Sequence, residues 1–522
     1  MLDETKVSTD ASPTTANTEI ELKLSADSKR LAQVRRTAFW SGSQRAQTRV
    51  LDSVYFDTIR HDLRARGFSL RIRKVGRRFR QTLKKAGKAG YFERAEYETD
   101  LPEGRPNLTE VPDAAVRAQL EDISPDELKP IFTTHVRRSR KLYQPEEGTA
   151  VEIALDEGEV RDDEHAAPLS EIELELKEGP PETLFKMARE LSGVIPVRLQ
   201  TQSKPEIGYS LRDQGKEAWR SAGKIKLDGD MTVEASLDAI IEYCASHVLN
   251  NDVCARERMH IEGVHQVRVG LRRLRSGLQL FKKVLPTEQY RWIDGEAKVF
   301  AQALGPAREF DVFREEILPS AAARMSEIGD FAALDEAAAR LQDQAYEMVR
   351  DALTSSRFTT FMIELMRWRK TRSWRNQTVN ARSALLFSPI TELSTPILAK
   401  RYKSALRKGR GFADLPLEKR HDVRIQIKKL RYATDFFSSL YQPKRRKVFV
   451  KRLGALQDDL GHLNDVVTLS EILGRILERT DTPQSCVAAG CLIGWYEHEI
   501  AREDQHLVQG WAAFEKATPF WD

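Results

Sequence analysis

The chain has 522 residues, of which 41% are hydrophobic and 31% charged, and its formal net charge is +5. This length predicts two to four domains, each able to bury a core of its own, and the composition is not that of a disordered chain. No stretch approaches eighteen uninterrupted apolar residues and the first residues contain no apolar core, so the sequence predicts neither a membrane span nor a secretion signal, and a cytoplasmic location is expected.

The charges are unevenly distributed, although they nearly cancel over the whole chain. Between Lys400 and Arg452, 18 Lys or Arg residues stand against 4 acidic ones, whereas between Val151 and Glu178, 11 acidic residues stand against 2 basic ones. The first block favours contact with a polyanion and the second contact with cations, with solvated helix faces and an acidic loop as the plain alternative. The four cysteines lack CxxC spacing, which indicates neither a zinc site nor a disulfide framework.

The N-terminal part is predicted to be mostly antiparallel sheet. Residues 1–17 are polar and are expected to form a disordered lead-in. Over residues 18–212, polar and apolar residues alternate in strand-length runs such as EIELKL, FSLRIRK and SEIELELKEG. The polar member is often charged, so one face of the sheet collects Glu, Arg and Lys. Such a face lies in water in an open sheet, or lines a closed sheet that holds a charged ligand, and the periodicity alone favours the open sheet.

Several strands place charges two residues apart, and therefore on one face. Alternating positions hold Glu19, Glu21 and Lys23; Arg71 and Arg73; Arg94, Glu96 and Glu98; and Glu171, Glu173 and Glu175, while Lys84 ends a further strand. Paired carboxylates can hold a hard cation, and Arg and Lys can bind phosphate oxygens. The first group alone is frequent on surface strands by chance, but the recurrence over several strands favours a metal and phosphate site.

These motifs resemble those of the CYTH domain, the triphosphate tunnel metalloenzymes. The matching segments are EIELK, VYFDT, LRIR, QTLK, RAEYE, ALDEG, EIELELK and SKPEIGY. The resemblance implies a closed antiparallel barrel of eight strands, with helices, whose tunnel holds a triphosphate, and this expectation replaces the open sheet. In one departure, Ile207 stands where the family often has an arginine.

The resemblance also implies roles for the charged residues. The expected ligands of Mg²⁺ or Mn²⁺ are Glu19, Glu21, Glu171 and Glu173, and Glu96 and Glu98 are acidic tunnel residues that assist a second metal. The expected phosphate ligands are Lys23, Arg71, Arg73, Lys84, Arg94, Arg138 and Lys204. The expected catalytic residues are Glu19, Glu21, Lys23, Glu96 and Glu98. Two assignments stay open, because Glu175 permits a shift of two residues in the acidic run and Arg137 and Arg140 rival Arg138.

After a linker at 213–229, residues 230–522 show the three-to-four spacing of amphipathic helices. This part contains a repeat, because HQVRVGLRRLR begins at His265 and HDVRIQIKKLR at His421. Basic residues follow each histidine at the third, seventh and tenth positions, as Arg268, Arg272 and Arg275, and as Arg424, Lys428 and Arg431. Since these positions span about 80° of a helix, each copy presents one basic stripe, and duplication of a helical unit explains the pattern.

This helical part resembles the CHAD domain through EGVHQVRVGLRRLRS, LGPAREFDV, HDVRIQIKKLRYATDFF and LQDDLGHLNDV. The resemblance implies an all-α domain of two duplicated helical-bundle units that binds inorganic polyphosphate along the two stripes, and an association with polyphosphate granules. His265 and His421 are expected either to bind the ligand or to order the helices. The lack of base-stacking aromatic residues among the basic ones argues against single-stranded nucleic acid as a partner.

Together, the two resemblances predict a metal-dependent inorganic triphosphatase, which cleaves triphosphate to pyrophosphate and phosphate, joined to a polyphosphate-binding domain. The alternatives are an adenylyl cyclase or organic-triphosphate hydrolase with the same barrel, and a non-catalytic polyphosphate-binding protein. No Ser, Cys or His nucleophile is expected, because positioning and electrostatic stabilisation account for most of phosphoryl-transfer catalysis. The sequence makes no prediction of the oligomeric state.

Overall fold

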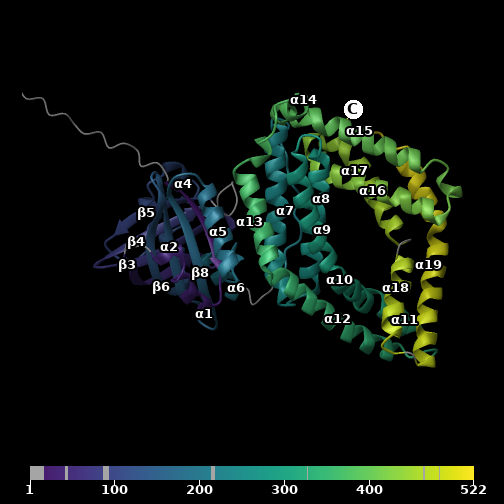
Figure 1. Cartoon of the computed structure of the whole chain (residues 1–522), viewed down its shortest axis with the longest axis horizontal. Coiled ribbons are helices and arrows are strands. Elements are labelled where there is room, and N and C mark those ends of the chain that lie inside the picture. Colours follow the sequence, from purple (N-terminus) through teal and green to yellow (C-terminus); the bar gives the residue numbers. More distant parts are fainter. Residues whose placement is uncertain are drawn as a thin grey trace, which may run out of the picture. The chain divides into compact units, whose positions relative to one another are not determined.

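The computed structural model describes residues 17–41, 45–85, 93–212, 218–325, 327–462, 465–480 and 482–521. The chain divides into two compact units, Met1–Glu217 and Ala218–Asp522. Figure 1 colours the first from purple to blue and the second from teal to yellow. Among the described residues, no helix is long and apolar enough to span a membrane.

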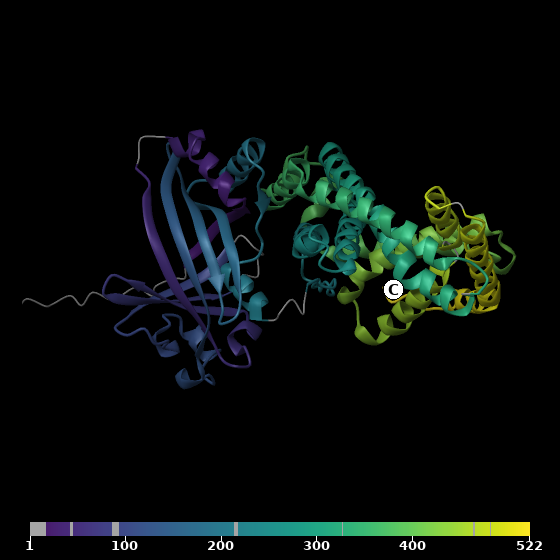
Figure 2. The same ribbon diagram turned by 90° about the horizontal axis from the view of Figure 1, so that it is seen from below.

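The first unit is an antiparallel sheet with helices. Its nine strands are β1 (Asn17–Ser25), β2 (Gln47–Asp57), β3 (Phe68–Val75), β4 (Arg78–Lys85), β5 (Glu93–Leu101), β6 (Lys129–Glu146), β7 (Thr149–Arg161), β8 (Ala166–Glu178) and β9 (Arg198–Leu199). They are ordered β5-β4-β3-β2-β6-β7-β8-β1-β9. Figure 2 shows the strands of this unit as purple and blue arrows, seen from below. The helices are α1 (Ser28–Val34), α2 (Ala38–Ser41), α3 (Asp62–Ala65), α4 (Ala114–Ala118), α5 (Glu182–Val194) and α6 (Lys204–Arg212).

The closed barrel of eight strands that the resemblance implied is not confirmed in that form. The sheet has nine strands, and β9, which has only two residues, pairs with the end of β1. β1 divides its other pairings, since residues 21–25 pair with β8 and residues 17–20 pair with β5. The first strand therefore lies beside both the acidic strand β8 and the strand that carries Glu96, which brings their charged residues together.

The alternation of the sequence separates two faces of the sheet. In β3, Leu70 and Ile72 are buried at 0% and 4% exposure, and the intervening Arg71 points to the opposite face. Leu70 belongs to an apolar core that residues near α3 and α4 complete, including Leu63 and Val116. A second core packs Tyr209 of α6 against β2 and β6. The apolar face of the sheet therefore packs against helices, whereas the charged face is available for a binding site.

The second unit is helical. Its α-helices are α7 (Val233–Arg256), α8 (Ile261–Phe281), α9 (Thr287–Ala303), α10 (Gly305–Val312), α11 (Leu318–Met325), α12 (Phe331–Thr354), α13 (Ser356–Lys370), α14 (Ala381–Ala384), α15 (Ile390–Lys408), α16 (Leu417–Phe437), α17 (Pro443–His462), α18 (Asp465–Leu477) and α19 (Pro483–Glu515). The two copies of the repeat form α8 and α16. These helices pack together, with the ring centroids of Phe281 and Phe437 6.2 Å apart.

Two glycines explain how closely α8 approaches α7. A Cβ atom at Gly270 would lie 2.7 Å from a methyl group of Val248, and one at Gly277 would lie 2.8 Å from a methyl group of Ile240. The glycines are seven residues apart, so they lie on one side of α8 and allow the two backbones to come close. The repeated histidine and the basic stripe occupy other positions of the same helix.

Candidate functional site

The charged face of the first unit encloses a cavity of about 660 Å³. Seven cationic and six anionic residues line it among those the structure describes: Lys23, Arg71, Arg73, Lys84, Arg138, Lys177 and Lys204, with Glu21, Glu96, Glu98, Asp156, Glu173 and Glu175. Cations and anions thus nearly cancel over the wall. The charged face therefore encloses a cavity, which the alternation of the sequence alone did not predict.

Three buried carboxylates form a cluster at the β7 and β8 side of the cavity. Asp156 is 0% exposed, Glu171 1% and Glu173 7%, and one oxygen of each lies within 4.8 Å of the others. The register of the sheet creates this cluster, because Asp156 and Glu171 are partners across β7 and β8. Glu173 shares a face of β8 with Glu171 because the two are two residues apart.

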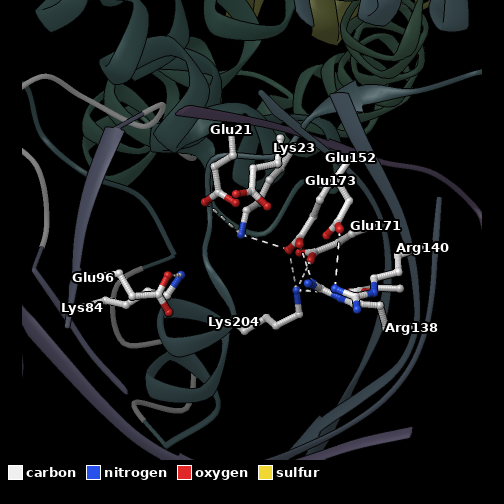
Figure 3. A network of polar contacts seen from close by, with 12 residues as sticks. Glu21, Lys23, Lys84, Glu96, Arg138, Arg140, Glu152, Glu171, Glu173 and Lys204 are labelled. Carbon is white, nitrogen blue, oxygen red and sulfur yellow. Dashed lines mark hydrogen bonds and ion pairs between the residues drawn. The ribbon is translucent and has the colours of Figure 1, made fainter. Parts of the chain in front are cut away.

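Three cations converge on the acidic cluster (Figure 3). The Nζ atom of Lys204 lies 2.9 Å from Asp156, 2.7 Å from Glu171 and 2.8 Å from Glu173. Arg138 donates two hydrogen bonds to Asp156, of 2.8 and 2.7 Å, and another to Glu173. Lys23 lies 3.0 Å from Glu173. Glu173 thus contacts all three cations.

These contacts keep Glu173 and Asp156 ionised. Burial by itself would raise the pKa of Glu173, but the charges of Arg138, Lys204 and Lys23 outweigh it, and the pKa lies well below the usual value. The pKa of Asp156 is lowered as well, because Lys204 and Arg138 outweigh burial and the charge of Glu173. Burial would lower the pKa of Lys204, yet the surrounding carboxylates raise it well above the usual value.

The β3 and β4 side of the cavity carries the cations Arg71, Arg73 and Lys84. Arg71 and Lys84 share Glu96, at 3.3 and 3.0 Å. The Nε atom of Arg71 is buried without a hydrogen-bond partner among the described residues, and Arg73 donates to the hydroxyl group of Ser53 at 3.0 Å. Burial and the charge of Arg71 lower the pKa of Arg73 to about 10. An anion placed here would relieve the repulsion between the two guanidinium groups.

The acidic cluster has the chemistry of a hard-cation site. It offers only carboxylate oxygens, which Mg²⁺ and Mn²⁺ prefer. One oxygen of Glu171 is buried and accepts no hydrogen bond among the described residues, and a buried oxygen of Glu21 lies 3.2 Å from the ammonium group of Lys23. A metal ion would satisfy such oxygens, so the residues fit the expected group.

The predicted metal ligands are only partly brought together. Glu171 and Glu173 lie in the cluster, whereas Glu175 is half-buried and pairs with Lys177 at 2.5 Å. Glu21 is buried at 6% exposure and is joined to Glu173 through Lys23, whose Nζ atom lies 3.2 Å from Glu21. The side chains of two predicted site residues, Glu19 and Arg94, lie outside the described residues.

Of the three rival arginines on β6, the cavity is lined by Arg138. Arg137 has an exposed side chain that pairs with Glu157, and Arg140 pairs with Glu152 at 3.5 Å (Figure 3). The predicted residues Lys23, Arg71, Arg73, Lys84, Glu96, Glu98 and Lys204 all line the cavity, although Glu98 is exposed.

Several residues of the cavity were not assigned from the sequence, and two of them are Asp156 and Tyr55. Asp156 lies in the ALDEG motif, and Tyr55, which is 4% exposed, lies in VYFDT. Pairing the ALDEG strand with the EIELELK strand would have placed Asp156 beside Glu171. No signal in the alternation pattern distinguishes Tyr55 from an ordinary core tyrosine.

In the second unit, the first basic stripe lies on α8. Arg272 is exposed, while Arg268 is half-buried and donates to the backbone carbonyl of Ala301. Arg275 is paired with Asp294 at 2.9 Å. His265 is half-buried, and burial together with the charge of the nearby Arg308 lowers its pKa to about 4. Arg308 lies in the LGPAREFDV motif and was not predicted as a site residue.

In the second stripe, on α16, the last arginine is also paired with a carboxylate. Arg431 pairs with Asp435 at 3.0 Å, as Arg275 does with Asp294 in the first copy. His421 is exposed, and Arg424 and Lys428 are half-buried. In both copies the arginine at the tenth position thus has a carboxylate partner within the protein.

Comparison with known proteins agrees with this division of the chain. The CYTH domain family matches residues 17–209, and the CHAD domain family matches residues 239–474. The chain therefore belongs to the proteins that carry an N-terminal CYTH domain and a C-terminal CHAD domain. An inorganic triphosphatase from Haemophilus influenzae is 30% identical over 208 residues, which cover 38% of this chain and 55% of that protein. The match thus spans about half the length of this relative.

Three solved structures are similar to parts of the chain. The CHAD domain from the plant Ricinus communis is 29% identical with a TM-score of 0.49, covering 58% of this chain and 98% of that one. PptA from Streptomyces chartreusis is 18% identical with a TM-score of 0.40, covering 54% and 100%. A Hippeastrum protein studied as an adenylyl cyclase, with a dominant triphosphatase activity, is 20% identical with a TM-score of 0.27, covering 37% and 95%.

Proposed function

We propose that the CYTH domain hydrolyses inorganic triphosphate to pyrophosphate and phosphate, with Mg²⁺ or Mn²⁺, and that the CHAD domain binds inorganic polyphosphate. The observation that carries the first half is the division of one cavity into a buried carboxylate cluster and, on its β3 and β4 side, a group of cations that includes Arg71, whose buried Nε atom has no hydrogen-bond partner among the described residues. The match to an inorganic triphosphatase supports the same reaction.

The proposal includes a tunnel closed around the substrate. The pairing of residues 17–20 of β1 with β5 supports it, because β5 and β1 are the first and the last of the eight longer strands in the sheet order. A closed wall would hold a linear triphosphate among side chains of all eight strands and keep bulk water away from its middle phosphate.

The metal would be held by Asp156, Glu171 and Glu173, with Glu21 nearby. When bound, a divalent cation neutralises phosphate oxygens and activates water for attack on phosphorus. The protein's own cations bind and orient the phosphates, with Arg71 offering its unpartnered Nε–H group. Glu96 lies between Arg71 and Lys84 and fixes their directions. Positioning and electrostatic stabilisation then account for the rate.

The test is phosphate release from inorganic triphosphate, ATP and thiamine triphosphate in parallel, with Mg²⁺ or Mn²⁺. We expect cleavage of inorganic triphosphate to be the fastest, to require the metal, and to be lost in Glu173→Gln but kept in the matched variant Glu175→Gln. Faster cleavage of ATP or thiamine triphosphate would favour an organic-triphosphate hydrolase, and formation of cyclic AMP a cyclase. If none of the three substrates is cleaved but the protein still binds polyphosphate, the protein is a binding protein without this activity.

The second half of the proposal rests on the basic stripes of α8 and α16. These helices pack against each other, so both stripes belong to one compact helical arrangement. Several Lys and Arg side chains along a path suit a linear polyanion, whose binding releases counterions and therefore weakens with salt.

A further inference from the structure

The ammonium group of Lys204 occupies the acidic cluster as a small cation would. It lies 2.9 Å or less from carboxylate oxygens of Asp156, Glu171 and Glu173. All four residues are 9% exposed or less, so water screens these contacts weakly. The lysine is therefore the internal partner of the residues that would hold the metal.

A divalent cation and this ammonium group exclude each other from the cluster. Both need the same oxygens, and a charge of +2 a few ångströms from a charge of +1 in a buried site is strongly repelled. One oxygen of Glu171 is buried without a hydrogen bond, but the facing oxygens of Asp156 and Glu173 already contact Lys204. Metal binding therefore requires the lysine to leave.

The structure allows the side chain to leave while its helix stays. Lys204 is the first residue of α6, and the backbone N–H of the preceding Ser203 donates to Glu206 at 2.7 Å. Further along the helix, Tyr209 is buried and bonded to Asp57 at 2.6 Å. Both contacts fix α6, whereas the lysine side chain has four rotatable bonds. Because Lys204 also lines the cavity, a turn of the side chain keeps its charge within reach of a bound phosphate.

We propose that Lys204 is an exchangeable internal cation, which holds the Asp156, Glu171 and Glu173 cluster while no metal is bound and moves to a phosphate oxygen of the substrate when the metal enters. This inference rests on the proposed function. Lys204 would thus contact the carboxylates first and the substrate afterwards. Metal binding and substrate binding are coupled, because both favour the position in which Lys204 has left the acidic cluster.

The experiment measures Mn²⁺ binding to the full-length protein without substrate, by electron paramagnetic resonance of the free ion. In Lys204→Gln the internal competitor is gone, so we expect the Kd for Mn²⁺ to fall by about tenfold. The matched control is Lys177→Gln, which removes the same charge from the same cavity but from a lysine paired with Glu175 and 43% exposed. Its Kd should change by less than about twofold.

Other results overturn the proposal. An unchanged or higher Kd in Lys204→Gln would show that the lysine does not compete with the metal. An equal fall of the Kd for Mn²⁺ in Lys177→Gln would show that removing any positive charge from the cavity strengthens metal binding. In Glu173→Gln the Kd should rise, and no rise would place the metal elsewhere. None of these readouts needs turnover, so they are independent of whether the protein cleaves triphosphate.

A crystal structure of the wild-type protein with Mn²⁺ provides a second test that needs no variant to fold. We expect Mn²⁺ among Asp156, Glu171 and Glu173, and the Nζ atom of Lys204 out of hydrogen-bond distance of all three. Mn²⁺ bound there with Lys204 still in place, or bound at another position, would contradict the exchange.

Discussion

The hydroxyl group of Tyr209 donates a hydrogen bond of 2.6 Å to Asp57, which lies 152 residues earlier in the chain. Asp57 is 0% exposed and also accepts from the backbone N–H groups of Thr58, Leu63 and Arg64. The carboxylate thereby joins the end of β2, α3 and α6, and α6 carries Lys204 into the cavity.

Removing this hydroxyl group should loosen α6. Tyr209→Phe keeps the ring contacts and loses one hydrogen bond to a buried carboxylate, so we expect the free energy of unfolding of the first unit to fall by about 1.5 to 3 kcal/mol. Urea denaturation measures it. Ser210→Ala is the control, since Ser210 is exposed and its hydroxyl group donates to the carbonyl of Glu206 within the helix. Equal losses in both variants would contradict the role of the Asp57 contact.

Asp156 should matter as much as the glutamates that the sequence predicted. Asp156→Asn removes one charge from the buried cluster, and we expect kcat/KM for triphosphate to fall on the order of 100-fold. The neighbouring Glu157 points elsewhere and pairs with Arg137 at 2.5 Å. Glu157→Gln should therefore retain activity within about twofold of the wild type. Steady-state rates of both variants, at saturating Mg²⁺, decide between these expectations.

The acidic cluster should give the first unit a defined response to acid. The pKa of Glu173 is lowered on folding, so its stabilising contribution is present above its unfolded pKa of about 4.3 and is lost as the pH falls toward the folded value. Calorimetry between about pH 3 and pH 7 should show the Tm of the first unit falling below about pH 4.5. Glu173→Gln should weaken that dependence, and an unchanged slope would show that other groups cause it.

The two arginines of the α8 stripe should differ in polyphosphate binding. Arg272 is exposed, whereas Arg275 is paired with Asp294. Arg272→Gln should weaken binding and reduce the slope of log Kd against log salt by about 0.7 to 1, because one phosphate contact is lost. Arg275→Gln should leave that slope unchanged. Fluorescence titrations with labelled polyphosphate at several salt concentrations measure both, and the reverse order would contradict the assignment.

His265 should add no charge to the ligand site near neutral pH. Its pKa of about 4 reflects burial and the charges of Arg308, Arg272 and Arg268, opposed by Glu262. Since the imidazole stays uncharged from pH 7.5 to pH 5.5, His265→Asn should not alter how polyphosphate affinity changes over that range. The same titrations at the two pH values test this. A pH response that disappears in the variant would show that the histidine does gain a proton.

The sequence predicted the classes of both units through physical periodicities. Alternation in β3 and β8 indicated strands because their side chains must face a core on one side and a charged surface on the other. It could not decide between an open sheet and a closed one, because alternation is the same in both. The charged face proved to enclose a cavity, and the split pairing of β1 that creates it depends on contacts between residues far apart in the chain.

The candidate site was predictable where a motif fixed both residue type and direction, as for Glu171 and Glu173. Asp156 was missed because its part in the cluster depends on the register between β7 and β8, which no local pattern reveals. The stripes were visible as helical spacing, but the spacing does not show which arginine already has a partner. Asp294 lies 19 residues beyond Arg275, on another helix.

The matched cations and anions of the cavity wall have a consequence for what can enter. Among the described residues, seven cations of the wall face six anions, so the charges of the wall nearly balance before any ligand arrives. A bare triphosphate would bring several negative charges into a space with almost no surplus to balance them. A triphosphate that carries its own divalent cations enters as a nearly uncharged salt. Under the proposed function, the cavity would therefore admit the metal complex of triphosphate more readily than the free anion.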